Sequence, residues 1–227
     1  MSEMNVQKYI SDLQTLFRAN ADPENAFNMK KYMKDNYEFY GIKTPERNEL
    51  TKDLLRKENI PGVEDAKSII IKLWKLPERE LQYFAMRLAE KVVKKFDAPS
   101  IEFLEYLVVN KSWWDTVDFI AANLVGMHFK RFPHLIEPNT VRWINSNNMW
   151  LQRSALLFQL KYKKETNTEL LFDYCTRLSK SNEFFIRKGI GWALREYSKY
   201  DPPSVRKFVK NTELSGLSNS EALRLIS

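Results

Sequence analysis

The sequence lacks the features that define several classes of protein. Cys175 is its one cysteine, which excludes an internal disulfide framework and suits a reducing compartment. No apolar run approaches the roughly 18 residues that a membrane span needs. The first residues, MSEMNVQKYISDLQ, have no apolar signal core and are typical of an amphipathic helix. We therefore expect a cytoplasmic protein that binds no membrane, with Cys175 as a buried structural thiol.

Glycine is scarce, and the sequence has no signal for a β-hairpin. Its 227 residues include six glycines and no Asn-Gly or Asp-Gly pair between alternating apolar runs. Apolar residues recur instead every three or four positions, as in Leu151, Ala155, Phe158 and Tyr162. Helix starts are marked by Asp22-Pro23, Thr44-Pro45, Asp201-Pro202 and a capping box at Ser218 and Glu221. The sequence therefore predicts an all-α protein.

Two repeats run along the chain. Successive intervals of 38, 38 and 39 residues separate the prolines Pro23, Pro61, Pro99 and Pro138. A second repeat, offset by 34 residues, aligns NMWLQRSALLFQLKYKK with NEFFIRKGIGWALREYSK. It pairs Arg153 with Arg187 and Lys161 with Arg195. Each unit has room for two helices and a turn, which is close to the period of HEAT repeats.

These repeats predict the architecture. Helix pairs of this kind stack into a curved α-solenoid with a concave face, here about six HEAT-like antiparallel helix pairs. Because no Gly/Ser-rich linker interrupts the sequence, we expect residues 1–227 to form a single domain. A generic helical bundle has the same apolar spacing and is the alternative. The proline register and the aligned basic positions favour the solenoid.

The segment from Lys111 to Asp118, KSWWDTVD, carries the first candidate functional residues. Ser112 is a natural N-cap, and Asp115 lies where a carboxylate favours the helix dipole. Asp118 is one helical turn after Trp114, so indole and carboxylate share a face. Adjacent indoles diverge by about 100°, and we expect Trp113 in the core and Trp114 beside Asp118. The alternative is a core tryptophan with a solvated aspartate.

Two later segments complete the set of candidates. Arg153 follows Asp118 by one repeat and could pair with it or bind a DNA phosphate. Trp192 and Arg195 are three residues apart and share a helix face. Gly189 and Gly191 lie inside the same helical pattern, where glycine costs stability, so we expect close packing or close approach of a ligand.

The charge of the protein indicates an anionic partner. The formal net charge is +7, which favours nucleic acid first. Lys161 and Arg195 occupy equivalent repeat positions, and we assign both to phosphate contacts. A carboxylate such as Asp118 would weaken a pure polyanion binder, so it indicates chemistry rather than binding alone. His128 and His134 are six residues apart without a cysteine or acidic cluster, so we expect no metal site.

Trp114, Asp118, Arg153 and Trp192, with SWWDTVD and IRKGIGWALREYSK around them, resemble the AlkD-type HEAT-like DNA alkylation repair glycosylases. The similarity covers nearly the whole chain, including Lys31-Tyr32-Met33. The resemblance implies removal of positively charged N3- and N7-alkylated purines from duplex DNA. It implies that two tryptophans and one aspartate contact the sugar of the lesion, without a pocket for the base. Trp114, Trp192 and Asp118 are thus the expected catalytic residues, and Arg153, Lys161, Arg195 and Tyr32 the expected DNA contacts.

The chemistry of such lesions agrees with these residues. An N3- or N7-alkylated purine is cationic and leaves as a neutral base, so the reaction needs no general acid and we expect no cofactor. Asp118 can stabilise the positive charge that develops on the sugar and hold the attacking water. Indole faces attract a cation as well. We expect a monomer acting on double-stranded DNA, associated with the nucleoid in a bacterium. The alternative is a non-catalytic HEAT-repeat scaffold that binds nucleic acid or an acidic protein partner.

Overall fold

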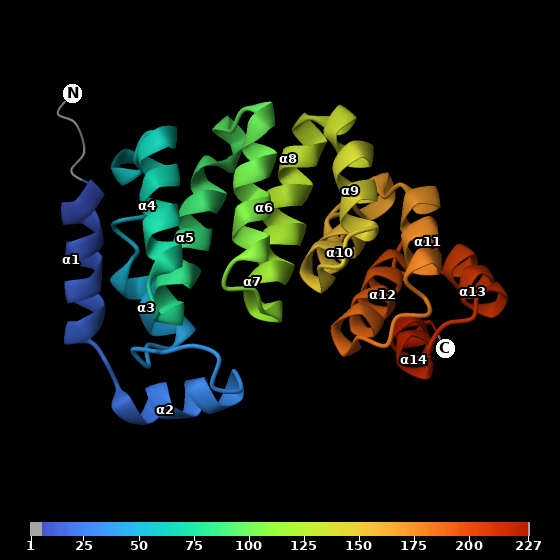
Figure 1. Ribbon diagram of the computed structural model, residues 1–227, viewed down its shortest axis with the longest axis horizontal. Helices are drawn as coiled ribbons and strands as arrows, with labels where there is room; N and C mark the ends of the chain where they lie inside the picture. Colours follow the sequence, from blue (N-terminus) through green and yellow to red (C-terminus); the bar gives the residue numbers. More distant parts are fainter. Residues whose placement is uncertain (1–5, 227) are drawn as a thin grey trace. The chain divides into compact units, whose positions relative to one another are not determined.

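A computed structural model describes residues 6–226 of the chain, and the regular elements of this range are helices joined by turns and loops (Figure 1). Glu38 and Glu78 form an isolated parallel β-bridge, and no strand forms within residues 6–226. The all-helical, α-solenoid-like class predicted from the sequence is confirmed. The chain divides into two compact units, residues 1–96 and 97–227. Its organisation as a single domain stays a prediction.

The first unit is built on three packed helices. α4 packs against both α1 and α5 (Figure 1). Its core contains large side chains such as Phe17, Ile69, Trp74 and Phe84. The helices of this unit are α1 (Val6–Ala19), α2 (Pro23–Tyr32), α3 (Thr44–Leu50), α4 (Val63–Lys75) and α5 (Arg79–Val92).

The expected helix starts of this unit are correct at α2 and displaced at α3. Asp22 is the N-cap of α2, accepts a hydrogen bond from the backbone N–H of Asn25, and precedes Pro23 at the first helical position. The sequence predicts Thr44 as the cap of α3, but Lys43 is the N-cap and Thr44 is already helical. Pro45 still lies in the first turn, where its missing N–H costs no hydrogen bond.

A buried carboxylate fixes the loop between α2 and α3. Glu80, in the first turn of α5, is fully buried and accepts hydrogen bonds from the backbone N–H groups of Tyr40, Gly41 and Ile42 at 3.1, 2.8 and 3.1 Å. Gly41 has φ +90, and a Cβ there would collide with the carbonyl oxygen of Asp22. Glu80 therefore holds the loop that leads from α2 into α3.

Glu80→Ala is expected to lower the free energy of unfolding by at least about 3 kcal/mol, because three buried N–H groups lose their acceptor. Chemical denaturation of the variant beside the wild type measures this. Glu90→Ala, on the same helix but in a surface pair with Arg87, is the control and should change stability far less. Equal losses in the two variants would contradict the role of Glu80.

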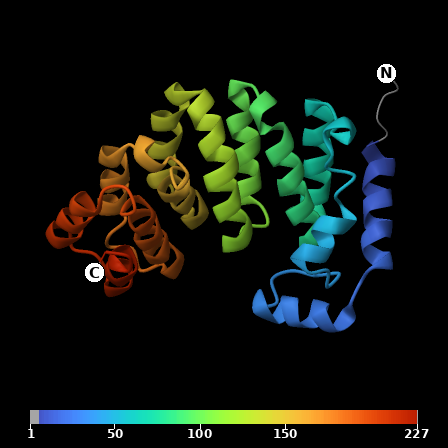
Figure 2. The ribbon, with the colours of Figure 1, turned by 180° about the vertical axis from the view of Figure 1, so that it is seen from behind.

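The second unit surrounds α10, which packs against α6, α7, α9 and α12 (Figure 1). α12 in turn packs against α14, and the view from behind shows the same neighbours (Figure 2). Cys175 is fully buried in this unit, as expected, and burial raises the pKa of its thiol. The helices are α6 (Ile101–Val109), α7 (Trp114–Phe119), α8 (Gly126–Arg131), α9 (Ile136–Ile144), α10 (Met149–Leu157), α11 (Thr168–Arg177), α12 (Phe184–Tyr197), α13 (Pro202–Asn211) and α14 (Gly216–Leu223).

Two of the expected caps in this unit are wrong. Trp113 is the N-cap of α7, and the Ser112 hydroxyl donates instead to the carbonyl of Val108, one turn back in the preceding helix. Ser215 caps α14, so Ser218 lies inside the helix and not at its start. In both cases the serine hydroxyl donates to a backbone carbonyl and does not accept from the N–H groups at the start of the helix. The expected cap of α13, Asp201, is confirmed by its bond from the N–H of Ser204.

The two glycines of α12 serve close packing, which is one of the two reasons expected. A Cβ at Gly191 would lie 2.5 Å from the Cβ of Glu221, so glycine lets α14 approach α12. A Cβ at Gly189 would lie 3.1 Å from a guanidinium nitrogen of Arg153.

Within residues 6–226, no helix combines the length and the apolar character that crossing a bilayer requires.

Candidate active site

The centre of the site is a two-point ion pair between α7 and α10. Arg153 donates from Nε to one carboxylate oxygen of Asp118 at 2.6 Å, and from a terminal nitrogen to the other at 2.8 Å. The remaining terminal nitrogen donates to the backbone carbonyl of Phe185 on α12. The Arg153 side chain is 5% exposed and that of Asp118 14%. The pair therefore joins three helices and leaves only an edge of the carboxylate open to solvent.

Opposing effects set the ionisation of Asp118. Burial raises its pKa above the ordinary value of an aspartate, while the hydrogen bonds and charge of Arg153 lower it. Burial is the larger effect, and the nearby Asp115 adds to it. Arg153 is thus the group that favours a charged carboxylate in a place where desolvation disfavours one.

Asp118 lies at the wall of an open cavity of about 290 Å³. The cavity lies between α7, the segment that follows it, the turn after α10, and α12. Trp192 of α12 presents an indole to the same space, and Lys161 presents a cation. Its lining residues are Asp118, Phe119, Ala122, Asn123, Leu160, Lys161, Trp192 and Glu196. Carboxylate, indole and ammonium group thus meet at one surface, and they belong to three of the candidate residues named from the sequence.

A π-helical segment, Ile120–Val125, follows Asp118 directly. Such segments are rare and occur often at functional sites. Asn123 within it donates to the carbonyl of Phe119 at 2.9 Å and accepts a hydrogen bond from Lys161. The Lys161 ammonium group is thereby held at the mouth of the cavity, although its side chain remains exposed.

The two adjacent tryptophans are both half-buried, so the expectation that Trp113 belongs to the core is only partly correct. Trp113 packs in an aromatic cluster with Trp150 and Phe185, at ring-centre distances of 5.8 and 5.3 Å. Trp114 opens α7 one turn before Asp118, and it is not among the residues that line the cavity in the described chain. Its role stays a prediction.

The other expected DNA contacts are more dispersed. Arg195 is half-buried and its guanidinium binds Glu221 of α14, so it does not line the cavity that contains Lys161. Arg153 adopts the ion pair with Asp118, one of the two arrangements expected, and a phosphate contact would have to share its buried guanidinium. Tyr32, at the end of α2 in the first unit, is 68% exposed.

Sequence patterns did not identify three residues that shape the site. Asn123 holds Lys161, Glu196 contributes a second carboxylate to the cavity, and Phe185 supplies the carbonyl that binds Arg153. Glu196 follows Trp192 by one helical turn, so its spacing could have placed it on the same face. No sequence signal indicates the other two, because one depends on the π-helical register and the other on a backbone atom.

Arg153→Met is expected to lower the free energy of unfolding at pH 7 by about 3–5 kcal/mol, because Asp118 is left charged and unpaired in a desolvated place. Removing Arg153 also raises the pKa of Asp118 further, so Asp118 is protonated at a higher pH in the variant. The loss of stability should therefore shrink as the pH falls.

Denaturant titrations from pH 4 to pH 8 measure this difference. Arg177→Met removes a half-exposed pair with Asp173 and serves as the control, with a much smaller loss. A loss for Arg153→Met that does not depend on pH would contradict the coupling to Asp118.

Comparisons with known proteins show the family of the chain. A family model described as DNA alkylation repair enzyme matches residues 13–226. A solved structure described as a predicted DNA alkylation repair enzyme from Enterococcus faecalis is 34% identical, with a TM-score of 0.84, and covers 91% of this chain and 97% of that one. A protein from Streptococcus mutans UA159 shares the fold at 18% identity, with a TM-score of 0.64 over 98% and 100% of the two chains. Among curated proteins none matches. The agreement over nearly the whole length shows that the chain belongs to the DNA alkylation repair enzyme family.

Proposed function

We propose that the protein is a monofunctional DNA glycosylase that hydrolyses the N-glycosidic bond of positively charged N3- and N7-alkylated purines in duplex DNA. Membership of the family supports a role in alkylation repair. The observation that carries the finer proposal is a carboxylate, Asp118, fixed by a buried arginine at the wall of a cavity that also holds an indole and a lysine.

The reaction places positive charge where this site has negative charge. As the bond between the purine and the sugar breaks, its electron pair moves to the cationic base, which leaves neutral. The sugar then carries positive charge, as in other glycosidic transition states. A preorganised carboxylate stabilises that charge, and it does so more strongly in a partly desolvated place than in water.

The same carboxylate can complete the hydrolysis. A water molecule held by Asp118 bonds through its oxygen to the sugar carbon, and its proton passes to the carboxylate. Arg153 uses one lone pair on each oxygen of Asp118, which leaves acceptor sites for this water. Trp192, at the same cavity, offers an aromatic face to the developing cation. We assign Trp114, one turn before Asp118, to the same role.

Phosphate contacts position the duplex in this proposal. Lys161 lies exposed at the mouth of the cavity, where a phosphate next to the lesion can replace Asn123 as its partner. Arg153, Arg195 and Tyr32 are assigned to the DNA backbone as well. The protein would act as a monomer on double-stranded DNA that contains alkylated purines. A site without a base pocket selects lesions by the lability of their glycosidic bond, and most base-processing enzymes differ from it in this respect.

Asp118→Asn is expected to abolish most excision while duplex affinity holds or rises, because a repulsive carboxylate is removed. Single-turnover release of N7-methylguanine and a binding titration on the same duplex test this together. Asp115→Asn, three residues earlier in the same helix, makes the same change of charge and should keep its excision. A denaturation curve shows whether the Asn variant is folded, because Arg153 loses its charged partner.

Undiminished release by Asp118→Asn would refute the mechanism. No release of any cationic purine by the wild type, with DNA affinity intact, would favour the scaffold that binds nucleic acid without catalysis.

Trp192→Ala and Trp114→Ala are each expected to slow excision with little loss of stability, because both indoles are half-buried. Single-turnover rates and denaturation curves test this. Trp143→Ala calibrates the stability measurement, because its indole is fully buried and its loss should cost about 3–5 kcal/mol. A loss of that size at Trp192 or Trp114 would show that the residue serves the core.

A further inference from the structure

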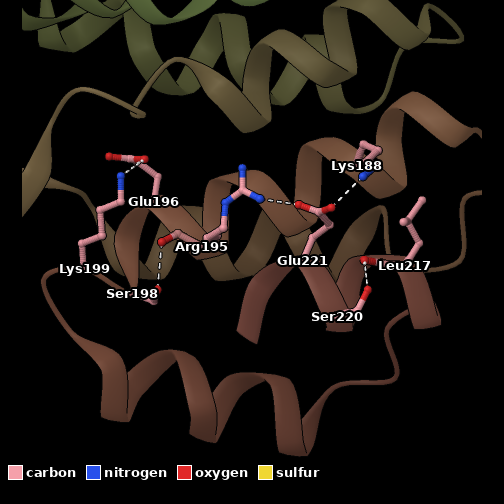
Figure 3. Close-up of polar contacts among 8 residues, drawn as sticks. All are labelled: Lys188, Arg195, Glu196, Ser198, Lys199, Leu217, Ser220 and Glu221. Atoms are coloured by element: carbon pink, nitrogen blue, oxygen red, sulfur yellow. Dashed lines mark hydrogen bonds and ion pairs between the residues drawn. The ribbon is translucent and has the colours of Figure 1, made fainter. Parts of the chain in front are cut away.

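One carboxylate on α14 binds both of the cations that flank Trp192 on α12 (Figure 3). Lys188 precedes Trp192 by four residues and Arg195 follows it by three, so all three side chains project from neighbouring positions on the helix. Lys188 donates to one oxygen of Glu221 at 2.6 Å, and Arg195 donates to the other. Glu221 thus neutralises part of the charge of the helix that carries a proposed catalytic indole.

Glu221 is fixed in this position by the packing of its helix. Gly191 allows α14 to approach α12 so closely that a Cβ there would meet the Cβ of Glu221. Ser218, one turn before Glu221, donates its hydroxyl to the carbonyl of Arg187 at 3.0 Å. These two contacts with α12 distinguish Glu221 from a mobile surface side chain.

The three charged groups differ in their access to solvent. The side chain of Glu221 is 15% exposed, whereas those of Arg195 and Lys188 are 22% and 37% exposed. The hydrogen bond from Lys188 and the surrounding positive charges lower the pKa of Glu221, which keeps it ionised. Both cations therefore keep part of their surface accessible to a second anion while Glu221 binds them.

We propose that Lys188 and Arg195 form a binding site for a backbone phosphate of DNA, and that Glu221 competes with the phosphate for them. This inference rests on the DNA-binding part of the proposed function. A phosphodiester group carries one negative charge on two oxygens, like the carboxylate that now binds the two cations. Glu221 lowers the affinity for every duplex equally, because phosphate contacts carry no information about the lesion.

Such competition favours lesion recognition over tight binding. Undamaged DNA is in large excess, and contacts shared by damaged and undamaged DNA retain the protein at sites where it has nothing to excise. A carboxylate that weakens one shared contact leaves the contacts of the cavity unchanged. Glu221 is therefore a residue that sets the affinity for undamaged DNA.

Glu221→Gln keeps the shape of the side chain and removes its charge, so it tests the competition. We expect tighter binding to an undamaged duplex and a steeper dependence on salt. When the salt concentration falls from 1 M to 0.1 M, each neutralised phosphate raises the affinity by about eightfold. A variant that neutralises one more phosphate than the wild type should therefore show this additional factor. An alkylated duplex of the same sequence should gain by the same factor. Fluorescence anisotropy titrations at several salt concentrations give both values.

Two further variants separate the local effect from net charge and from misfolding. Glu213→Gln changes the net charge equally but removes a pair with Lys180 whose side chains are 85% and 69% exposed, and it should gain less than about twofold. Glu221→Asp keeps the net charge and shortens the side chain, and it should bind DNA with intermediate affinity. It also serves as the test if Glu221→Gln does not fold.

Equal gains in Glu221→Gln and Glu213→Gln, or weaker binding by both Glu221 variants, would overturn the competition. Weaker binding would mean that Glu221 orients the two cations for DNA. The excision assay distinguishes this failure from that of the proposed function. If the wild-type protein excises nothing but Glu221→Gln binds DNA more tightly, the glycosylase proposal is refuted and the phosphate site is still supported.

Discussion

The candidate site depends on the ion pair between Arg153 and Asp118. A buried pair of this kind gains little stability over apolar side chains of the same size, because both ions lose their hydration. Its effect here is geometric. The guanidinium connects α7, α10 and α12 through Asp118 and the carbonyl of Phe185, and Gly189 leaves the space that it occupies. The position of the carboxylate and the spacing of the helices that carry the cavity residues are therefore set by one side chain.

Much of the second unit could be predicted from the sequence, because the relevant signals are local or strictly periodic. Apolar spacing predicts the helical class, and an interval of one repeat predicts that Asp118 and Arg153 can be neighbours, with the observed ion pair as one of two expected arrangements. The repeat was less reliable for Lys161 and Arg195. α10 ends at Leu157, whereas α12 continues to Tyr197, so Lys161 lies in a turn and Arg195 in a helix. Their aligned positions in the sequence do not lead to equivalent contacts.

The features that escaped prediction depend on contacts between distant segments. The π-helical segment after Asp118 has no sequence pattern of its own, yet it places Asn123 against Lys161. Ser218 and Glu221 have the spacing of a capping box, but tertiary contacts with α12 use both residues instead. Helix geometry alone could not predict which of Trp113 and Trp114 is buried. Trp113 is the N-cap and has an extended backbone, so the angle between neighbouring helical residues does not apply to this pair.

Asp118 and Glu221 are both bound by cations, and the burial of those cations separates the roles of the two carboxylates. Arg153 is nearly inaccessible, so a phosphate that contacts it shares the guanidinium with Asp118 and does not displace it, and the charge of Asp118 stays available to the cavity. Lys188 and Arg195 keep part of their surface in solvent, so a phosphate can approach them without unpacking a helix. Negative charge near a polyanion costs affinity in both places. At Asp118 the loss of DNA affinity accompanies stabilisation of the cationic sugar during excision. At Glu221 the loss of affinity is the proposed function of the residue, because it weakens binding to undamaged DNA.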